Sequence, residues 1–288
     1  MSKLQFMTRL NDHDFTPVEV EGSQVALILI DLWEVHWCST MEARTGLLAK
    51  KVNQLLPAMR DNGVRIIHAP SLRDPPNFYP GSGKFYEKEE NDKNGFLRRQ
   101  AFLNAPTPDK RKIRELPTDE QVPQITWNEG KKTAPANWAY PLQQDGCDGT
   151  DRRSNPNPKD QHWPPYRQHP SIQIDNPDIV ANETESYRIL MFLRARSIKH
   201  LVFGGVATNE CVVWTRNTSI YWMQKLITAV SGSPITCYLA RDLTDTMYVK
   251  PNNAPSWEVH DSGTAATVTW IERNLKVASI LSSDLVSL

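Results

Sequence analysis

The sequence predicts an α/β protein with a doubly wound, Rossmann-like, mostly parallel sheet between two layers of helices. Apolar β-branched runs alternate with helical patterns near both ends of the 288-residue chain, which is typical of such a sheet. The clearest run, residues 25–30, is apolar at every position, as expected for a central strand buried on both faces. We therefore expect one three-layer α/β/α domain over 1–288, with ligands bound beyond the carboxyl ends of its strands.

The first half of the pattern predicts strand, helix, strand. The strand over 25–30 stops at Asp31. A helix over about 41–62 follows, because leucines and other apolar residues recur on one of its faces and Asn62-Gly63 supplies an end signal. A second strand is expected over 64–68.

Between residues 70 and 170 the periodic pattern stops. This stretch holds 15 of the 21 prolines, and it is too long for a loop within a compact domain. We expect an insertion with short elements of its own that closes over the site as a lid. Its many aromatic residues argue against disorder.

Regular alternation resumes after the insertion. We expect strands over 178–181, 200–203 and 235–239, and helices over 183–196, from the Cys211 region to about 226, and over 260–274. Asp31 and the segment 208–211 both fall at carboxyl ends of predicted strands.

Composition excludes several classes of partner. The 33 basic residues balance 33 acidic ones, so no basic field is expected to attract nucleic acid or a membrane surface. The longest apolar stretch is far shorter than the roughly 20 residues that span a bilayer, and residues 1–6 lack the apolar core of a signal peptide. We expect a cytoplasmic protein whose partner is a small molecule.

Four cysteines are too few for a disulfide framework in a chain of this size. Their spacing includes no CxxC pair and no zinc pattern, so we expect at least one free thiol. Cys38 is one candidate for a spare thiol near the site.

Cys211 is the candidate nucleophile. It comes three residues after Thr208, a candidate helix N-cap, where backbone N–H groups and the helix dipole favour a thiolate. Asp31 could accept the proton, and backbone N–H groups of the same turn could stabilise an oxyanion. The alternative is a small buried cysteine with no chemical role.

These residues carry a resemblance to a known family. Val-Ala-Leu-Ile-Leu-Ile-Asp at 25–31 and Gly-Val-Ala-Thr-Asn-Glu-Cys-Val at 205–212 resemble the isochorismatase-like cysteine hydrolases, which include nicotinamidases and N-carbamoylsarcosine amidases. The resemblance covers about 20–70 and 170–288. It implies Cys211 as nucleophile, Asp31 as base, the N–H groups of Ala207 and Cys211 as oxyanion donors, and a cis peptide bond between Val206 and Ala207.

One family feature is missing. The family's catalytic lysine would fall at Asn182, and no lysine lies between Lys159 and Lys199. Without a cation, a thiolate and a carboxylate side by side would force one of them to stay protonated. His36 is the first candidate to replace the lysine, ahead of Lys84 and Arg188.

Four further residues form the expected substrate-binding set, which consists of Trp33, Trp37, Asn182 and Thr208. The tryptophans could wall a pocket for a flat or apolar substrate, or could simply belong to the core. We expect no metal, because the Asp-x-His pair of the zinc-binding family members is missing after the second strand. No cofactor is expected, since Gly204-Gly205 is not part of a dinucleotide-binding run.

The leading hypothesis is a cysteine hydrolase that cleaves a C–N bond of a small amide, carbamoyl or cyclic imide compound through a thioester. The first alternative is a catalytically silent binding or assembly protein that lost the lysine. The second is ether hydrolysis of the isochorismate type, which would not need Cys211. The resemblance also implies a homo-oligomer.

Overall fold

We analysed a computed structural model of the chain. It describes ten stretches of residues, which are 2–11, 14–70, 127–128, 131–132, 147–150, 168–175, 178–181, 186–229, 234–247 and 256–286.

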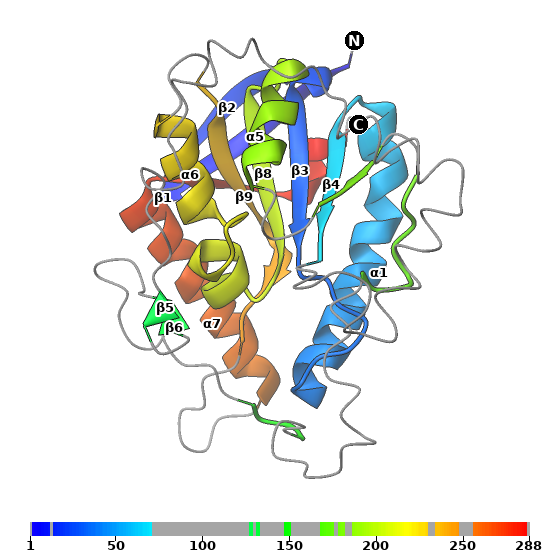
Figure 1. Ribbon diagram of the computed structural model, residues 1–288, viewed down its shortest axis with the longest axis vertical. Coiled ribbons are helices and arrows are strands. Elements are labelled where there is room, and N and C mark those ends of the chain that lie inside the picture. Colours follow the sequence, from blue (N-terminus) through cyan, green and yellow to red (C-terminus); the bar gives the residue numbers. More distant parts are fainter. Residues whose placement is uncertain are drawn as a thin grey trace.

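An eight-stranded sheet forms the centre of the described part (Figure 1). Its strands are β1 (Lys3–Asn11), β2 (Asp14–Glu21), β3 (Val25–Ile30), β4 (Arg65–Ala69), β7 (Ile179–Val180), β8 (His200–Val206), β9 (Thr236–Asp245) and β10 (Ala278–Ile280). They lie in the order β2-β1-β10-β9-β8-β3-β4-β7. The strands from β10 to β7 pair in parallel, and β1 is antiparallel to both of its neighbours. The short strands β5 (Trp127–Asn128) and β6 (Lys131–Lys132) form a separate antiparallel pair.

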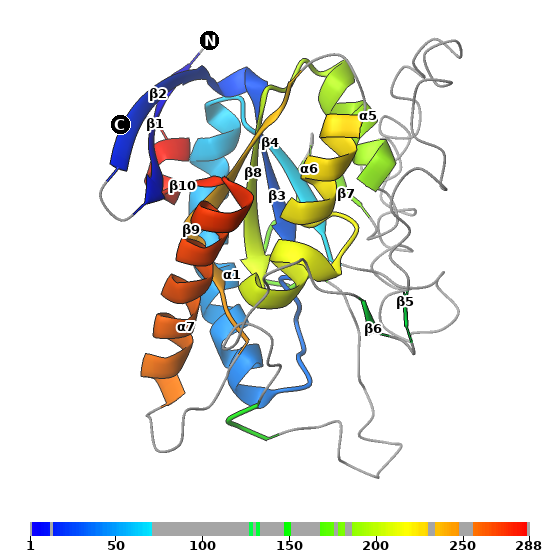
Figure 2. The same ribbon diagram turned by 90° about the vertical axis from the view of Figure 1, so that its left-hand side faces the viewer.

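Helices cover both faces of this sheet. In the described stretches the α-helices are α1 (Ser39–Asp61), α5 (Ser186–Ala195), α6 (Ile220–Ala229) and α7 (Ser256–Trp270). The same stretches contain π-wound η3 (Thr208–Thr215) and η4 (Ile271–Leu275) and the 3-10 turns η1 (Gly22–Gln24) and η5 (Ser282–Leu285). In Figure 2, α5 and α6 lie on one side of β3 and β8, and α1 lies on the other.

Strand β3 shows why two cores form. All six of its residues are buried, and alternate side chains of a strand point to opposite faces. Ala26, Ile28 and Ile30 join the apolar cluster under α5, α6 and η3. Val25, Leu27 and Leu29 join the cluster under α1 and the β1–β2 hairpin. This two-sided burial confirms the predicted α/β/α fold class.

Three differences from the expected elements matter. The hairpin of β1 and β2 and the strand β10 were not predicted, because they carry no long apolar run and most residues of β2 are exposed. The single helix expected from Cys211 to 226 is wrong, since η3 ends at Thr215 and α6 begins at Ile220. The insertion over 70–170, with its proposed lid, lies mostly outside the described residues, and so does Asn182.

The expectation of a spare thiol at Cys38 is also wrong. Cys38 forms a disulfide with Cys147, whose Cα atom lies 5.4 Å away across 109 residues of sequence. The spacing of two cysteines so far apart carries no signal of pairing, which only the folded chain brings about. Cys211 and Cys237 are the free thiols.

None of the described helices combines the length and apolar character needed to cross a bilayer.

Gly205 is required where β8 passes β3. Its φ is +118°, and a Cβ atom added to it would lie 1.9 Å from the carbonyl oxygen of Ile30. We expect Gly205→Ala to lower the free energy of unfolding by at least about 3 kcal/mol. Gly46→Ala is the matched control, because its Cβ would contact His169 at an ordinary 3.5 Å. Urea unfolding followed by tryptophan fluorescence measures both, and equal midpoints would contradict the prediction.

Candidate active site

Asp31 lies at a sharp turn at the carboxyl end of β3. Its φ is 53°, a left-handed conformation that is uncommon for residues other than glycine. Its N–H donates to the carbonyl of Ala69 at 3.1 Å, and its carbonyl accepts from the N–H of Trp33 at 2.8 Å. The side chain is fully buried. The turn therefore takes the chain away from the sheet while the carboxylate stays at its edge.

Cys211 reaches the same place from the neighbouring strand. Strands β3 and β8 pair in parallel with Ile30 opposite Gly205, so Asp31 and η3 follow at the same end of the sheet. This end is the lower one in Figure 1, where the yellow-green turn of η3 lies below β8. The Cys211 side chain is within hydrogen-bonding reach of the Asp31 carboxylate. The structure thus brings together the two side chains on which the sequence analysis depends.

The turn before Cys211 differs from the expected helix start. Ala207, not Thr208, occupies the N-cap position, and its side chain forms no cap. The Thr208 hydroxyl is instead buried 2.7 Å from the Thr244 hydroxyl, which donates to the carbonyl of Gly205. The peptide bond between Val206 and Ala207 is cis, as the resemblance implies. The oxyanion roles of the Ala207 and Cys211 N–H groups remain predictions.

Arg216 supplies a positive charge that the sequence analysis did not consider. Its Nε donates to Oδ2 of Asp31 at 2.7 Å, and the two side chains are 9% and 0% exposed. Such a charge-assisted bond is among the strongest available to a buried carboxylate. Arg216 therefore lies against the predicted base and brings a positive charge to it.

Burial raises the pKa of the Cys211 thiol to about 12. Arg216 lowers this pKa and the Asp31 carboxylate raises it, but both effects are smaller than that of burial. Burial therefore favours the thiol over the thiolate, against the effect expected from the helix start. A nucleophilic Cys211 must hand its proton to a neighbouring base as it reacts.

The expected aromatic residues gather beside Asp31. Trp33 is buried, its indole N–H donates to the carbonyl of Pro70 at 3.1 Å, and its ring lies 5.6 Å from the guanidinium carbon of Arg216. The His36 ring stacks on Trp33 with centroids 5.6 Å apart and lies 5.2 Å from the Trp37 ring. His36 Nδ1 accepts the N–H of Cys38 at 3.0 Å. Substrate contacts by Trp33 and Trp37, and catalysis by His36, remain predictions.

A second polar cluster lies under β4 and β7. The Asp178 carboxylate accepts from Arg60 at 2.6 Å and is 3.2 Å from His68 Nε2, and His68 Nδ1 is 3.1 Å from Gln168. Burial alone would raise the pKa of Asp178, but the hydrogen bonds from His68 and Arg60 outweigh it and leave the pKa lowered. This cluster joins α1 to β4 and β7 and acts as a structural support.

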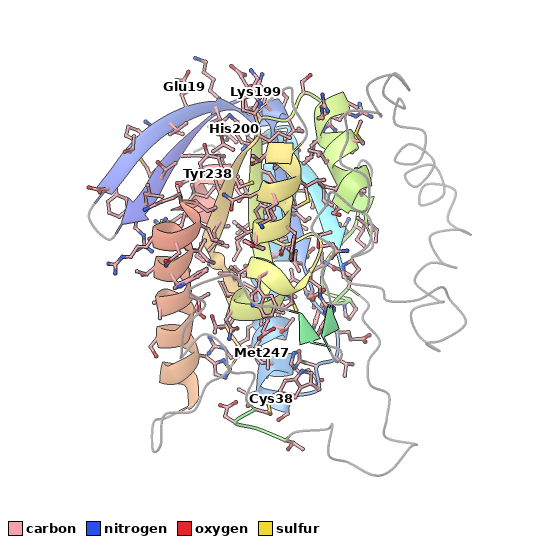
Figure 3. The ribbon with its side chains drawn as sticks, turned by 60° about the vertical axis from the view of Figure 1, so that its left-hand side comes forward. Glu19, Cys38, Lys199, His200, Tyr238 and Met247 are labelled. Atoms are coloured by element: carbon pink, nitrogen blue, oxygen red, sulfur yellow. A yellow bond between two sulfur atoms is a disulfide. The ribbon has the colours of Figure 1, made fainter. Side chains whose placement is uncertain are left out.

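The disulfide attaches residues 147–150 to the start of α1. Figure 3 shows Cys38 at the lower end of the molecule, in the same region as Met247. Ser39 and Thr150 exchange two hydrogen bonds of 2.8 and 3.2 Å, and Asp148 lies 3.4 Å from His260 on α7. Disulfides are rare in reducing compartments, so this bond weighs against the predicted cytoplasmic location.

Comparisons with known proteins give distant structural likeness. No family model matches the chain, and no curated protein matches it. A solved cysteine hydrolase from Pseudomonas syringae pv. phaseolicola 1448A is similar with a TM-score of 0.44 and 10% identity, over 92% of each chain. An isochorismatase family protein from Burkholderia thailandensis is similar with a TM-score of 0.40 and 13% identity, over 91% of this chain and 93% of that one.

Sequence reasoning missed Arg216 among the site residues. Arg216 follows Cys211 by five residues, a spacing that has no meaning on an α-helix and becomes informative only once the π-winding is known. Within the described stretches, no group of three or more His, Cys, Asp or Glu side chains is placed to hold a metal ion.

Proposed function

We propose that this protein is a cysteine hydrolase that cleaves a C–N bond of a small amide, carbamoyl or cyclic imide compound. The observation that carries the proposal is the contact of the Cys211 side chain with the Asp31 carboxylate, beside the guanidinium of Arg216. A thiol next to a buried base is the arrangement that nucleophilic catalysis requires.

The proposed reaction has two halves. As the Cys211 sulfur attacks the carbonyl carbon, its proton passes to Asp31 and the carbonyl oxygen becomes an oxyanion. The N–H groups of Ala207 and Cys211 would hold that oxygen. When the intermediate collapses, the C–N bond breaks, the nitrogen takes the proton from Asp31, and a thioester remains. Asp31 then takes a proton from water as the water attacks the thioester. When the C–S bond breaks, the acid leaves and the Cys211 sulfur takes the proton back from Asp31.

Because the pKa of Cys211 is about 12, the proposed role of Asp31 is to accept the thiol proton during the attack itself. At pH 7 a thiol with this pKa is ionised in roughly one molecule in 10⁵, so attack by a preformed thiolate would be slow. If the proton moves to Asp31 during the attack, the reaction does not depend on this small thiolate fraction.

The same pKa is what favours the second candidate, a silent binding or assembly protein. A Cys211 thiol would not react if it stayed protonated and no neighbouring group took up its proton. The two candidates differ in whether a covalent acyl-enzyme ever forms on Cys211.

We expect Cys211→Ala to abolish hydrolysis, because no other group in the proposed reaction forms the thioester. The assay is ammonia or amine release from a panel of small amides, N-carbamoyl compounds and cyclic imides, with intact-mass detection of the acyl-enzyme after acid quench. Cys237→Ala is the matched control, since Cys237 is the second free thiol and lies buried in β9. It should retain turnover. Turnover by Cys211→Ala equal to that of the wild type would overturn the proposal.

A further inference from the structure

Arg216 lies where it can balance two negative groups. It holds Asp31 at 2.7 Å, and Asp31 in turn contacts Cys211. When Cys211 loses its proton, the sulfur anion lies beside the Asp31 carboxyl group. Each of these two acids makes it harder for the other to carry a negative charge. A cation there favours the charged over the neutral forms of both acids.

The π-winding of η3 explains how Arg216 reaches this position. In an α-helix each residue turns by 100°, so a residue five places on points about 140° away around the axis. In η3 the N–H of Val212 bonds to the carbonyl of Ala207, five residues earlier, at 3.1 Å. Hydrogen bonds over five residues lower the rotation per residue, so the end of η3 at Thr215 comes closer to the face of Cys211 than it would in an α-helix.

The end of η3 fixes that orientation. Arg216 has extended backbone angles, φ −96° and ψ 149°, and so ends the helix. Its carbonyl accepts the N–H of Ser219 at 3.1 Å, which starts the turn into α6. An uninterrupted helix from Cys211 onward would have pointed the guanidinium away from Asp31.

Trp33 holds the other side of the guanidinium. The Arg216 Cζ atom lies 5.6 Å from the Trp33 ring, which is itself anchored to Pro70 by its indole N–H. A cation over an indole face is favourable where water is largely excluded. The Asp31 carboxylate and the Trp33 ring therefore define one position for the Arg216 guanidinium.

We propose that Arg216 is the positioning cation of this site, supplied from the helix that carries Cys211 instead of from a neighbouring strand. It orients Asp31 and offsets its charge while Cys211 loses its proton. This inference rests on the proposed function for its role in turnover. Unlike a lysine, a guanidinium keeps its charge at every accessible pH, so the site would not lose its cation on burial.

The test compares Arg216→Met, which removes the charge, with Arg216→Lys, which keeps it. The readout is the rate at which iodoacetamide alkylates Cys211 between pH 7 and pH 10, followed by the mass of the Cys211 peptide. We expect Arg216→Met to label at least tenfold more slowly than the wild type at pH 8, and Arg216→Lys to label within about threefold of it. Arg60→Met is the matched control, because Arg60 is an equally buried arginine whose ion pairs are with Asp175 and Asp178. It should label like the wild type.

A second pair of variants covers the case in which Arg216→Met does not fold. Asp31→Asn and the double variant Asp31→Asn/Arg216→Met differ only by the arginine, and the double variant leaves no buried charge unpaired. We expect the double variant to label at least tenfold more slowly than Asp31→Asn. Equal labelling within either pair would overturn the inference.

The labelling assay needs no substrate, so it separates this inference from the proposed function. Slower labelling of Arg216→Met without turnover of any amide in the panel would support the cation and count against the hydrolase. Amide turnover that is equal in Arg216→Met and the wild type would support the hydrolase and overturn the inference.

Discussion

Replacing Asp31 with asparagine is expected to abolish hydrolysis and, at the same time, to make Cys211 easier to alkylate. Asparagine cannot accept the thiol proton, so turnover should fall at least about 1000-fold. The carboxylate also raises the pKa of Cys211, and its removal leaves the positive charge of Arg216 near the sulfur. The pKa of the thiol should therefore fall, and alkylation by iodoacetamide at pH 8 should accelerate about tenfold.

Turnover is expected to fall while the alkylation rate of Cys211 is expected to rise, so the two measurements together distinguish this prediction from a simple loss of fold. A variant that had simply lost its fold would alkylate both Cys211 and Cys237, whereas the expected variant accelerates only at Cys211. Asp178→Asn is the matched control, since Asp178 is also a buried aspartate paired with an arginine. It should leave the labelling rate of Cys211 unchanged. Slower labelling of Asp31→Asn than of the wild type would contradict the prediction that the Asp31 carboxylate raises the pKa of Cys211.

Reduction of the Cys38–Cys147 disulfide is expected to destabilise the protein by about 4 kcal/mol. The bond closes a stretch of 109 residues, and a loop of that length restricts the unfolded chain strongly. For a chain of this size the loss corresponds to a drop in Tm of roughly 7 °C. Thermal unfolding with and without dithiothreitol measures the effect.

The double variant Cys38→Ala/Cys147→Ala is the control for other effects of the reductant. Its Tm should be as low as that of the reduced wild type and should not respond to dithiothreitol. Thiol titration in denaturant should find two thiols before reduction and four after it. Four thiols in the unreduced protein would contradict the disulfide.

The Cys38–Cys147 disulfide also affects the residues beside the candidate active site. Cys38 ends the segment that carries Trp33 and His36, and its N–H bonds to the His36 ring. Reduction should therefore loosen the aromatic residues against Arg216 and lower hydrolysis as well as stability. A protein that needs this bond works best where the redox environment is oxidising.

The sequence alone determined the layered architecture and pointed to the two principal candidate site residues. An uninterrupted apolar run such as residues 25–30 has few stable arrangements other than a strand buried on both faces, because every side chain must leave water. Parallel strands end at one edge, so Asp31 and the turn before Cys211 could be placed together from their order in the chain. The cis bond before Ala207 followed from the resemblance rather than from any periodicity.

The tertiary structure decided what local patterns do not encode. The pairing of Cys38 with Cys147 depends on where two distant segments meet. The raised pKa of Cys211 depends on burial by the whole fold, which overrides the helix-start effect expected from position. The hydrogen bond from Arg216 to Asp31 depends on the π-winding of η3, in which hydrogen bonds span five residues. The local sequence pattern does not indicate this winding. A single regular helix from Cys211 to about 226, as the sequence analysis expects, would have carried the arginine away from Asp31.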